Sequence, residues 1–188
     1  MGVNSRKIGE GPAQTQGSKA TAMADILVLT TGGTIDKLYF DALSEYQVGE
    51  TVVGRVLAAA RVTAPVRIAE LMRKDSLELT DEDRAAIARA VADAPENHVV
   101  ITHGTDTMAE TARALAAAIP AVLDNKTVVL VGALAPARFA ESDAPFNLGL
   151  AFGTAQAARP GVWITMNGQV FDGRHVRKDR AAGKFVTD

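Results

Sequence analysis

Short apolar segments alternate with helix-like stretches along most of this chain, and the apolar segments end in loops that contain glycine and threonine. A short, continuous apolar segment bounded by glycine or polar residues is typical of a strand that is covered on both faces. Five such strands are predicted, over residues 26–30, 66–71, 98–102, 127–132 and 162–166. Helices are predicted between them, over residues 51–61, 80–94, 106–119 and 145–158.

This alternation predicts an α/β fold, a three-layer α/β/α domain with a mostly parallel sheet and right-handed crossovers. The second helix begins at Thr80-Asp81-Glu82-Asp83, which resembles a capping box, and Pro120 is expected to end the third. Ligands of such sheets bind beyond the carboxyl ends of the strands, where the strand order reverses. The candidate site therefore lies among the loops 31–46, 72–79, 103–107, 133–144 and 167–178.

The length of 188 residues is that of one domain, or of one domain and a tail. Residues 1–22 are rich in Gly, Ser, Gln and Thr and contain no continuous apolar segment, so they are predicted to be a disordered leader or vector remnant. Met23 is then the expected native start, and residues 23–188 are expected to form one domain. The last residues, 181–188, carry no helix or strand pattern.

Composition excludes several kinds of protein. The absence of cysteine excludes disulfides, cysteine-ligated zinc and thiol nucleophiles. A net charge of −2 argues against a nucleic-acid partner, and no apolar segment reaches the roughly 18 residues of a membrane span. His98, His103 and His175 lack the spacing of metal ligands, and the phosphate-loop and serine-hydrolase motifs are missing. No metal and no cofactor is therefore expected, and His103 is interpreted as a residue that orients its loop.

Two of the loops that follow strands resemble each other. One reads Thr31-Gly32-Gly33-Thr34 and the other His103-Gly104-Thr105-Asp106-Thr107. They share one crevice if the strands lie in the order 2-1-3-4-5. Thr34 and Thr105 are then candidate nucleophiles, and Asp106 with Lys178 could take a proton from Thr105. The plainer alternatives stay open: a tight turn, ordinary helix caps and a solvated surface lysine.

Four ordered motifs between residues 26 and 178 resemble the bacterial-type L-asparaginase family, whose members are asparaginase/glutaminase amidohydrolases. The first two are Thr31–Ile35 and His103–Met108, the second followed by Glu110-Thr111-Ala112. The third comprises Val131-Gly132-Ala133, Pro136, Asp143 and Pro145-Phe146-Asn147-Leu148. The last comprises Met166-Asn167, Asp172-Gly173-Arg174, Val176 and Lys178.

The resemblance implies the N-terminal domain type of this family and hydrolysis of the asparagine amide through a threonine acyl-enzyme, with release of ammonia. It implies that Thr34 is the nucleophile, that Tyr46 assists it and closes over the substrate, and that Thr105, Asp106 and Lys178 form a second cluster. The implied substrate-binding residues are Asp75 for the α-amino group, Ser76, Gly104 for the oxyanion and Ala133 for the amide. The loop from residue 35 to residue 50 is long, as lids often are.

The chain also departs from the family pattern. Arg73 stands two positions before Asp75, where the family usually has serine, so either Ser76 or Arg73 could hold the substrate α-carboxylate. Lys37 and Tyr39 lie close to Thr34 in sequence, and Lys37 is either a surface lysine or an alternative base. The family's smaller C-terminal domain is missing. A naturally short enzyme is favoured over a truncated chain, because every intra-subunit catalytic position is retained.

Other functions compete with an L-asparaginase acting on L-asparagine, and on L-glutamine as a second candidate. One is a glutaminase-type subunit that supplies ammonia to a partner, and another is a non-catalytic module that binds Asn or Asp. Retention of Asp106, Lys178 and both threonines argues against the binding module. A self-cleaving threonine hydrolase would have to be cut between Gly33 and Thr34, which would separate the first strand from its loop. A cytoplasmic homo-oligomer is expected.

Overall fold

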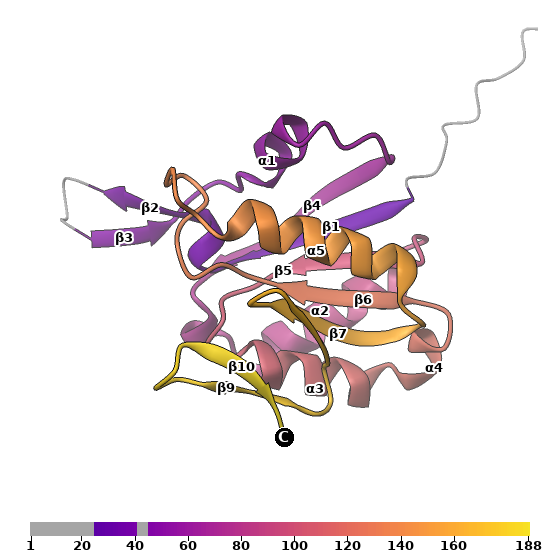
Figure 1. Ribbon diagram of the computed structural model, residues 1–188. Helices are drawn as coiled ribbons and strands as arrows, with labels where there is room; N and C mark the ends of the chain where they lie inside the picture. Colours follow the sequence, from indigo (N-terminus) through magenta and orange to yellow (C-terminus); the bar gives the residue numbers. More distant parts are fainter. Residues whose placement is uncertain (1–24, 41–44) are drawn as a thin grey trace, which may run out of the picture.

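The sheet at the centre of the molecule has six strands in the order β4–β1–β5–β6–β7–β8 (Figure 1). This computed structural model describes residues 25–40 and 45–188, so the predicted leader lies outside the described residues. The five predicted strands are parallel, and their order is the expected 2-1-3-4-5. They are β1 (Ile26–Gly32), β4 (Val66–Lys74), β5 (His98–Thr102), β6 (Thr127–Val131) and β7 (Gly161–Met166).

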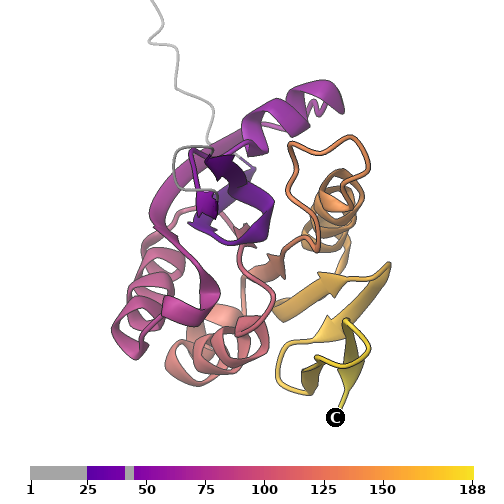
Figure 2. The same ribbon diagram turned by 90° about the vertical axis from the view of Figure 1, so that its left-hand side faces the viewer.

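Helices cover both faces of this sheet, which confirms the three-layer α/β/α prediction (Figures 1 and 2). One face carries α1 (Val53–Ala59) and α5 (Ala144–Ala157). The other carries α2 (Asp81–Asp93) and α3 (Met108–Ala118), and the short α4 (Pro120–Leu123) follows α3. Pro120 thus stands directly after the end of α3, as predicted, and also begins the next helical turn.

Successive side chains of β1 point to opposite faces of the sheet and so contribute to two hydrophobic cores, one on each face. Ile26 and Val28 pack with α1 and α5, whereas Leu27 and Leu29 pack with α2 and α3. All seven residues of β1 are buried, as the continuous apolar segment predicts. Complete burial of one such aliphatic side chain is worth about 1.5–3 kcal/mol, so this central strand is a main source of stability.

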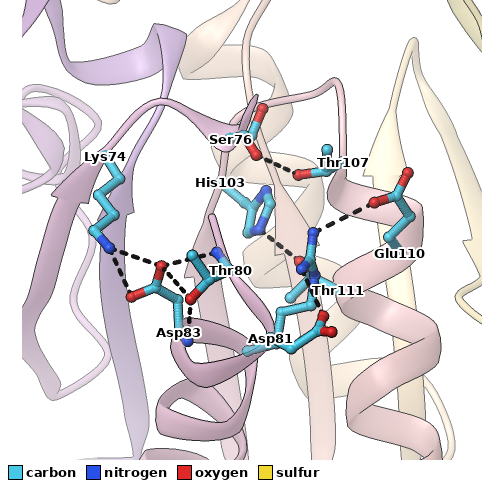
Figure 3. Close-up of polar contacts among 10 residues, drawn as sticks. Lys74, Ser76, Thr80, Asp81, Asp83, His103, Thr107, Glu110 and Thr111 are labelled. Carbon is cyan, nitrogen blue, oxygen red and sulfur yellow. Dashed lines mark hydrogen bonds and ion pairs between the residues drawn. The ribbon is translucent and has the colours of Figure 1, made fainter. Parts of the chain in front are cut away.

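The predicted capping box at the start of α2 is present. The Thr80 hydroxyl accepts from the backbone N–H of Asp83, and the Asp83 carboxylate accepts from the backbone N–H of Thr80. The Asp83 carboxylate also binds Lys74 at the end of β4, with an Nζ–Oδ2 distance of 2.7 Å (Figure 3). This connection ties the start of α2 to the strand that leads into the candidate site.

Five short strands were not predicted. The segment 35–50 contains a hairpin of β2 (Lys37–Phe40) and β3 (Glu45–Val48) after a 3₁₀ turn, η1 (Thr34–Asp36). β8 (Gln169–Asp172) extends the sheet antiparallel to β7. The expectation that residues 181–188 lack structure is wrong, because β10 (Lys184–Thr187) pairs with β9 (Val176–Asp179). Each of these five strands has four residues and no apolar segment longer than three, so they lack the continuous apolar pattern used to find the other strands.

Figure 2 looks toward the edge where the parallel strands end, and the β2–β3 hairpin projects from that edge. The second 3₁₀ turn, η2 (Ser76–Glu78), lies in the loop after β4. The described part of the chain contains no helix with the length and hydrophobicity of a membrane span. Trp163 of β7, interpreted from the sequence as core, packs against the α1–α5 side of the core but is only partly buried.

Candidate active site

The loops after β1, β4 and β5 meet in direct backbone contact. Gly33 has a positive φ of 83°, and a Cβ atom placed on it would lie 2.6 Å from the Cα atom of Gly104. A Cβ atom on Gly104 would lie 2.6 Å from the Cβ atom of Ser76. Only glycine permits such close approach at these two positions. The two glycine–threonine loops therefore lie against each other, as the predicted strand order implied.

His103 orients the β5 loop from inside the protein, as predicted (Figure 3). Its Nδ1 lies 2.7 Å from the carbonyl oxygen of Gly104, and its Nε2 lies 2.9 Å from the Thr111 hydroxyl. Because a carbonyl can only accept, Nδ1 donates and Nε2 accepts from Thr111. Burial lowers the pKa of His103 to about 4, so the ring is neutral at pH 7 and keeps this tautomer.

Thr107 joins the β5 loop to the loop after β4. Its hydroxyl donates to the backbone oxygen of Ser76 over 2.7 Å (Figure 3). Thr107 is also the N-cap residue of α3, but its side chain makes no capping hydrogen bond there. The Thr107 hydroxyl thus binds a neighbouring loop and does not cap α3, although an ordinary helix cap was one of the plainer alternatives for this loop.

Thr105, Asp106 and Lys178 lie together. Lys178 Nζ is 2.7 Å from the Thr105 hydroxyl and 2.8 Å from Asp106 Oδ1. The Lys178 side chain is only 14% exposed, so it is not the solvated surface lysine of the plainer interpretation. It comes from β9, and the C-terminal hairpin therefore carries it to the β5 loop, 73 residues away in sequence.

A pocket of about 320 Å³ lies in front of Thr34. The Tyr46 ring enters it from β3 and meets Phe139 edge-on, with ring centroids 6.2 Å apart. Tyr46 is nevertheless 50% exposed, so this face of the pocket opens to solvent. Its lining residues are Thr34, Lys37, Tyr46, Leu134, Ala135, Pro136 and Phe139. Phe139 was not among the residues predicted for the site. The signal that could have identified it is an aromatic side chain in a loop that follows a strand.

A second pocket, of about 480 Å³, adjoins the first and shares Lys37 and Tyr46 with it. Asp75 lines it and forms an ion pair with Lys37, with an Oδ2–Nζ distance of 2.7 Å. Burial acts to raise the pKa of Asp75, but the hydrogen bonds from Lys37 and from the backbone N–H of Leu77 keep it below the ordinary value. The carboxylate therefore carries its charge at neutral pH.

Arg73 also lines this second pocket, in the position where the family pattern has serine. Its Nε lies 2.8 Å from Glu70 Oε2, and its Nη2 lies 3.9 Å from Glu50 Oε1. The guanidinium is partly exposed, so it is accessible to an anion that enters the pocket.

The remaining predicted residues lie behind the pocket walls. Ser76 and Ala133 are each 1% exposed, and Gly104 is buried between Gly33 and Ser76. The Ser76 hydroxyl is buried with no hydrogen-bond partner in the described part of the chain. Beyond Ala133, the Asp143 carboxylate accepts from the backbone N–H groups of Leu134 and Ala135 and fixes that loop. The roles assigned to Ser76, Gly104 and Ala133 stay predictions.

The sequence profile of the family described as asparaginase, N-terminal matches residues 25–184. The chain belongs to this asparaginase family. It is 36% identical over 168 residues to L-asparaginase 2 of Escherichia coli K12, covering 85% of this chain and 47% of the relative. It is 31% identical over 170 residues to the glutaminase-asparaginase of Pseudomonas fluorescens biotype A, covering 84% of this chain and 46% of that protein.

Solved structures of asparaginases have the same fold. The thermostable L-asparaginase from Thermococcus kodakarensis superposes with a TM-score of 0.73 at 31% identity, over 86% of this chain and 50% of that one. The probable cytoplasmic L-asparaginase from Campylobacter jejuni gives a TM-score of 0.74 at 30% identity, over 87% and 53%. The asparaginase-family chain described here thus spans about half the length of the relatives it matches.

The site is built from hydroxyl, ammonium and carboxylate groups. Within residues 25–40 and 45–188, no three His, Cys, Asp or Glu side chains gather in a way that could hold a metal ion. The groups that are present can attack a carbonyl carbon, move protons and stabilise negative charge on oxygen, which are the three needs of amide hydrolysis.

Proposed function

We propose that this asparaginase-family chain is an amidohydrolase that converts L-asparagine to aspartate and ammonia through an acyl-enzyme on Thr34. The observation that carries the proposal is the cluster of Thr105, Lys178 and Asp106 at the β5 loop, which contacts the β1 loop that precedes Thr34. A threonine hydroxyl is a weak nucleophile and needs neighbouring groups that move its proton. In this proposal the cluster supplies such groups to Thr34 across the contact between the two loops.

In the first half-reaction, Thr34 Oγ1 bonds to the amide carbon and the C–N bond breaks. The hydroxyl proton of Thr34 ends on the leaving nitrogen, with the Thr105 hydroxyl as relay and Lys178 and Asp106 as its partners. In the second, water adds to the ester carbon, a water proton returns to Thr34, and aspartate leaves. Tyr46 covers the substrate during both steps, since it already reaches over the Thr34 pocket.

The non-reacting end of the substrate fits the second pocket. We assign the α-amino group to the Asp75 carboxylate, whose low pKa keeps it negative, and the α-carboxylate to the Arg73–Ser76 region. The Gly104 backbone would hold the oxyanion, and Ala133 would contact the amide. Glutamine is a second candidate substrate, because a relative such as the Pseudomonas fluorescens protein is named a glutaminase-asparaginase.

The test is ammonia release from asparagine and from glutamine by the parent protein, Thr34→Ala, Thr105→Val and the control Thr63→Val. Each site variant should lose at least ~3 kcal/mol of transition-state stabilisation, a fall of about 10²-fold or more in rate. Thr63 is an exposed residue before β4, so its variant should keep the parent rate. Unchanged turnover in both site variants would contradict the mechanism.

Two other outcomes would redirect the assignment. No ammonia from either amide, together with saturable binding of asparagine or aspartate, would favour the non-catalytic binding module. Ammonia from glutamine alone would favour the ammonia-supplying subunit.

We further propose that the protein is a cytoplasmic homo-oligomer. Light scattering would measure the assembly, and cell fractionation would measure the localisation. Relatives include both a probable cytoplasmic and a probable periplasmic asparaginase.

A further inference from the structure

Lys37 lies on the same side of its turn as Thr34. The backbone N–H of Lys37 donates to the carbonyl oxygen of Thr34 and closes η1. In a 3₁₀ turn, side chains three positions apart eclipse each other. Both side chains accordingly line the same pocket of about 320 Å³. The turn thus presents a hydroxyl and an ammonium group to one space.

Asp75 fixes the ammonium group from across the crevice. Asp75 Oδ2 lies 2.7 Å from Lys37 Nζ, and the pair is only partly exposed, at 26% and 29%. The other carboxylate oxygen, Oδ1, accepts from the backbone N–H of Leu77 over 3.2 Å. Asp75 is the N-cap residue of η2 and also forms a capping box with Glu78. Its carboxylate is therefore held in place independently of Lys37.

The site thus contains two sets of the same three residue types. Thr105, Lys178 and Asp106 form one, and Thr34, Lys37 and Asp75 provide the other. In each set, a lysine paired with an aspartate accompanies a threonine hydroxyl at the carboxyl edge of the sheet. The second set joins the β1 loop to the β4 loop, whereas the first joins the β5 loop to β9.

We propose that Lys37, held by Asp75, is a positioning residue that activates Thr34. Its ammonium charge stabilises the negative charge that builds on Thr34 Oγ1 as the hydroxyl proton leaves for the amide nitrogen. In a site that is partly shielded from water, a fixed positive group stabilises a developing negative charge far more strongly than it would in bulk water. This inference rests on the proposed role of Thr34 as nucleophile.

Other charged groups face the same space. Glu45 of β3, Arg73 of β4 and Glu78 of η2 line the second pocket with Lys37, and Tyr46 lines both pockets. Arg73 pairs with Glu70, and the Glu78 carboxylate accepts from the backbone N–H of Asp75. Among the residues that line the Thr34 pocket, Lys37 carries the positive charge. A neutral side chain at position 37 would therefore remove that charge from the pocket.

The experiment compares Lys37→Met, Lys37→Arg and Asp75→Asn with the control Lys74→Met. Lys74 is the neighbouring lysine on β4, and it pairs with Asp83 at the start of α2 (Figure 3). Steady-state ammonia release is measured across pH for each protein. In parallel, an activated ester, p-nitrophenyl acetate, is used to acylate Thr34, and the acetyl group is located by mass spectrometry of the digested protein. Thermal unfolding verifies that each variant is folded.

Lys37→Met should lower kcat and the rate of Thr34 acetylation about 10-fold to 100-fold, and move the pH profile to higher pH. Lys37→Arg keeps the charge and should retain most of the rate and the parent pH profile. Asp75→Asn should resemble Lys37→Met in acetylation, because the ammonium is then no longer fixed. Lys74→Met should match the parent.

Equal acetylation of Thr34 in the parent and Lys37→Met would overturn the inference, and so would a Lys37→Arg variant as slow as Lys37→Met with an unshifted pH profile. These failures are distinct from failure of the proposed function. If the parent releases no ammonia but Thr34 is acetylated, the ester reaction still tests Lys37 while the asparaginase activity is refuted. If neither ammonia release nor ester acylation depends on Thr34, as judged by the Thr34→Ala variant, both proposals are wrong.

Discussion

His103 is a buried, neutral side chain at the centre of the candidate site, although it touches neither of the two pockets described. Its ring joins Gly104 to Thr111 and so fixes the loop that carries Thr105 and Asp106 to the start of α3. A protonated ring could not accept the Thr111 hydroxyl proton, and it would place a charge in a site with no exposure to water. The geometry of this loop therefore depends on His103 remaining uncharged.

This dependence predicts a stability change with pH. In the unfolded chain His103 binds a proton below about pH 6.5, whereas in the folded protein burial lowers its pKa to about 4. Between these values the unfolded state binds more protons, so the free energy of unfolding falls as pH falls, by up to about 3 kcal/mol. Urea unfolding from pH 7 to about pH 4 should show this loss in the parent and a smaller one in His103→Gln. Parallel pH profiles for the two proteins would contradict the assignment.

Among the elements, the loops after β1, β4 and β5 depend on glycine at their contacts. The contact of Gly104 with Ser76 leaves no space for a methyl group, whereas Gly149 in α5 has nothing within 4 Å of its Cβ position. Gly104→Ala should therefore destabilise the protein by about 1–3 kcal/mol through overpacking and lower the rate of ammonia release. Gly149→Ala, in an exposed helical position, should stabilise it by about 1 kcal/mol. Chemical unfolding of both variants checks the pair, and a Gly104→Ala protein as stable as the parent would refute the close contact.

The sequence predicted the elements that are buried on both sides and missed those that are not. The five parallel strands have continuous apolar patterns, and the glycine and threonine residues at their ends marked the site. The strands of the β2–β3 and β9–β10 hairpins have four residues each, such as Glu45-Tyr46-Gln47-Val48, and are too short and too polar to show the continuous apolar pattern of a buried strand. The Lys37–Asp75 pair was missed for a different reason: the predicted strand order places the β1 and β4 loops side by side, but it does not determine which of their side chains meet.

At the scale of the whole molecule, the C-terminal hairpin is the element that completes the Thr105 cluster. Lys178 of β9 is the cross-strand partner of Phe185 in β10, so the two side chains lie on one face of the hairpin. Phe185 is 2% exposed and packs against Phe171 of β8, with ring centroids 6.3 Å apart. The position of Lys178 therefore depends on burial of one aromatic ring.

Phe185→Ala should destabilise the protein by about 3–5 kcal/mol, because a large buried side chain is lost and a cavity remains. It should also lower kcat under conditions where the variant is folded, since Lys178 is then held less firmly against Thr105. Val186→Ala is the matched control, as Val186 is only partly buried on the same strand. Thermal unfolding and ammonia release check both effects. A folded Phe185→Ala protein with the parent kcat would show that the hairpin does not position Lys178.

The separation of 73 residues between Thr105 and Lys178 has a consequence for the biosynthesis of the protein. The ribosome adds about 5–20 residues per second, and domains begin to fold from the N-terminal side as they emerge. The sheet strands β1, β4 and β5 can therefore pair while Lys178 is still to be made. During that interval the nascent chain exposes Thr105 and Asp106 without their lysine, so the cluster on which the proposed hydrolysis depends forms only after translation has passed β9.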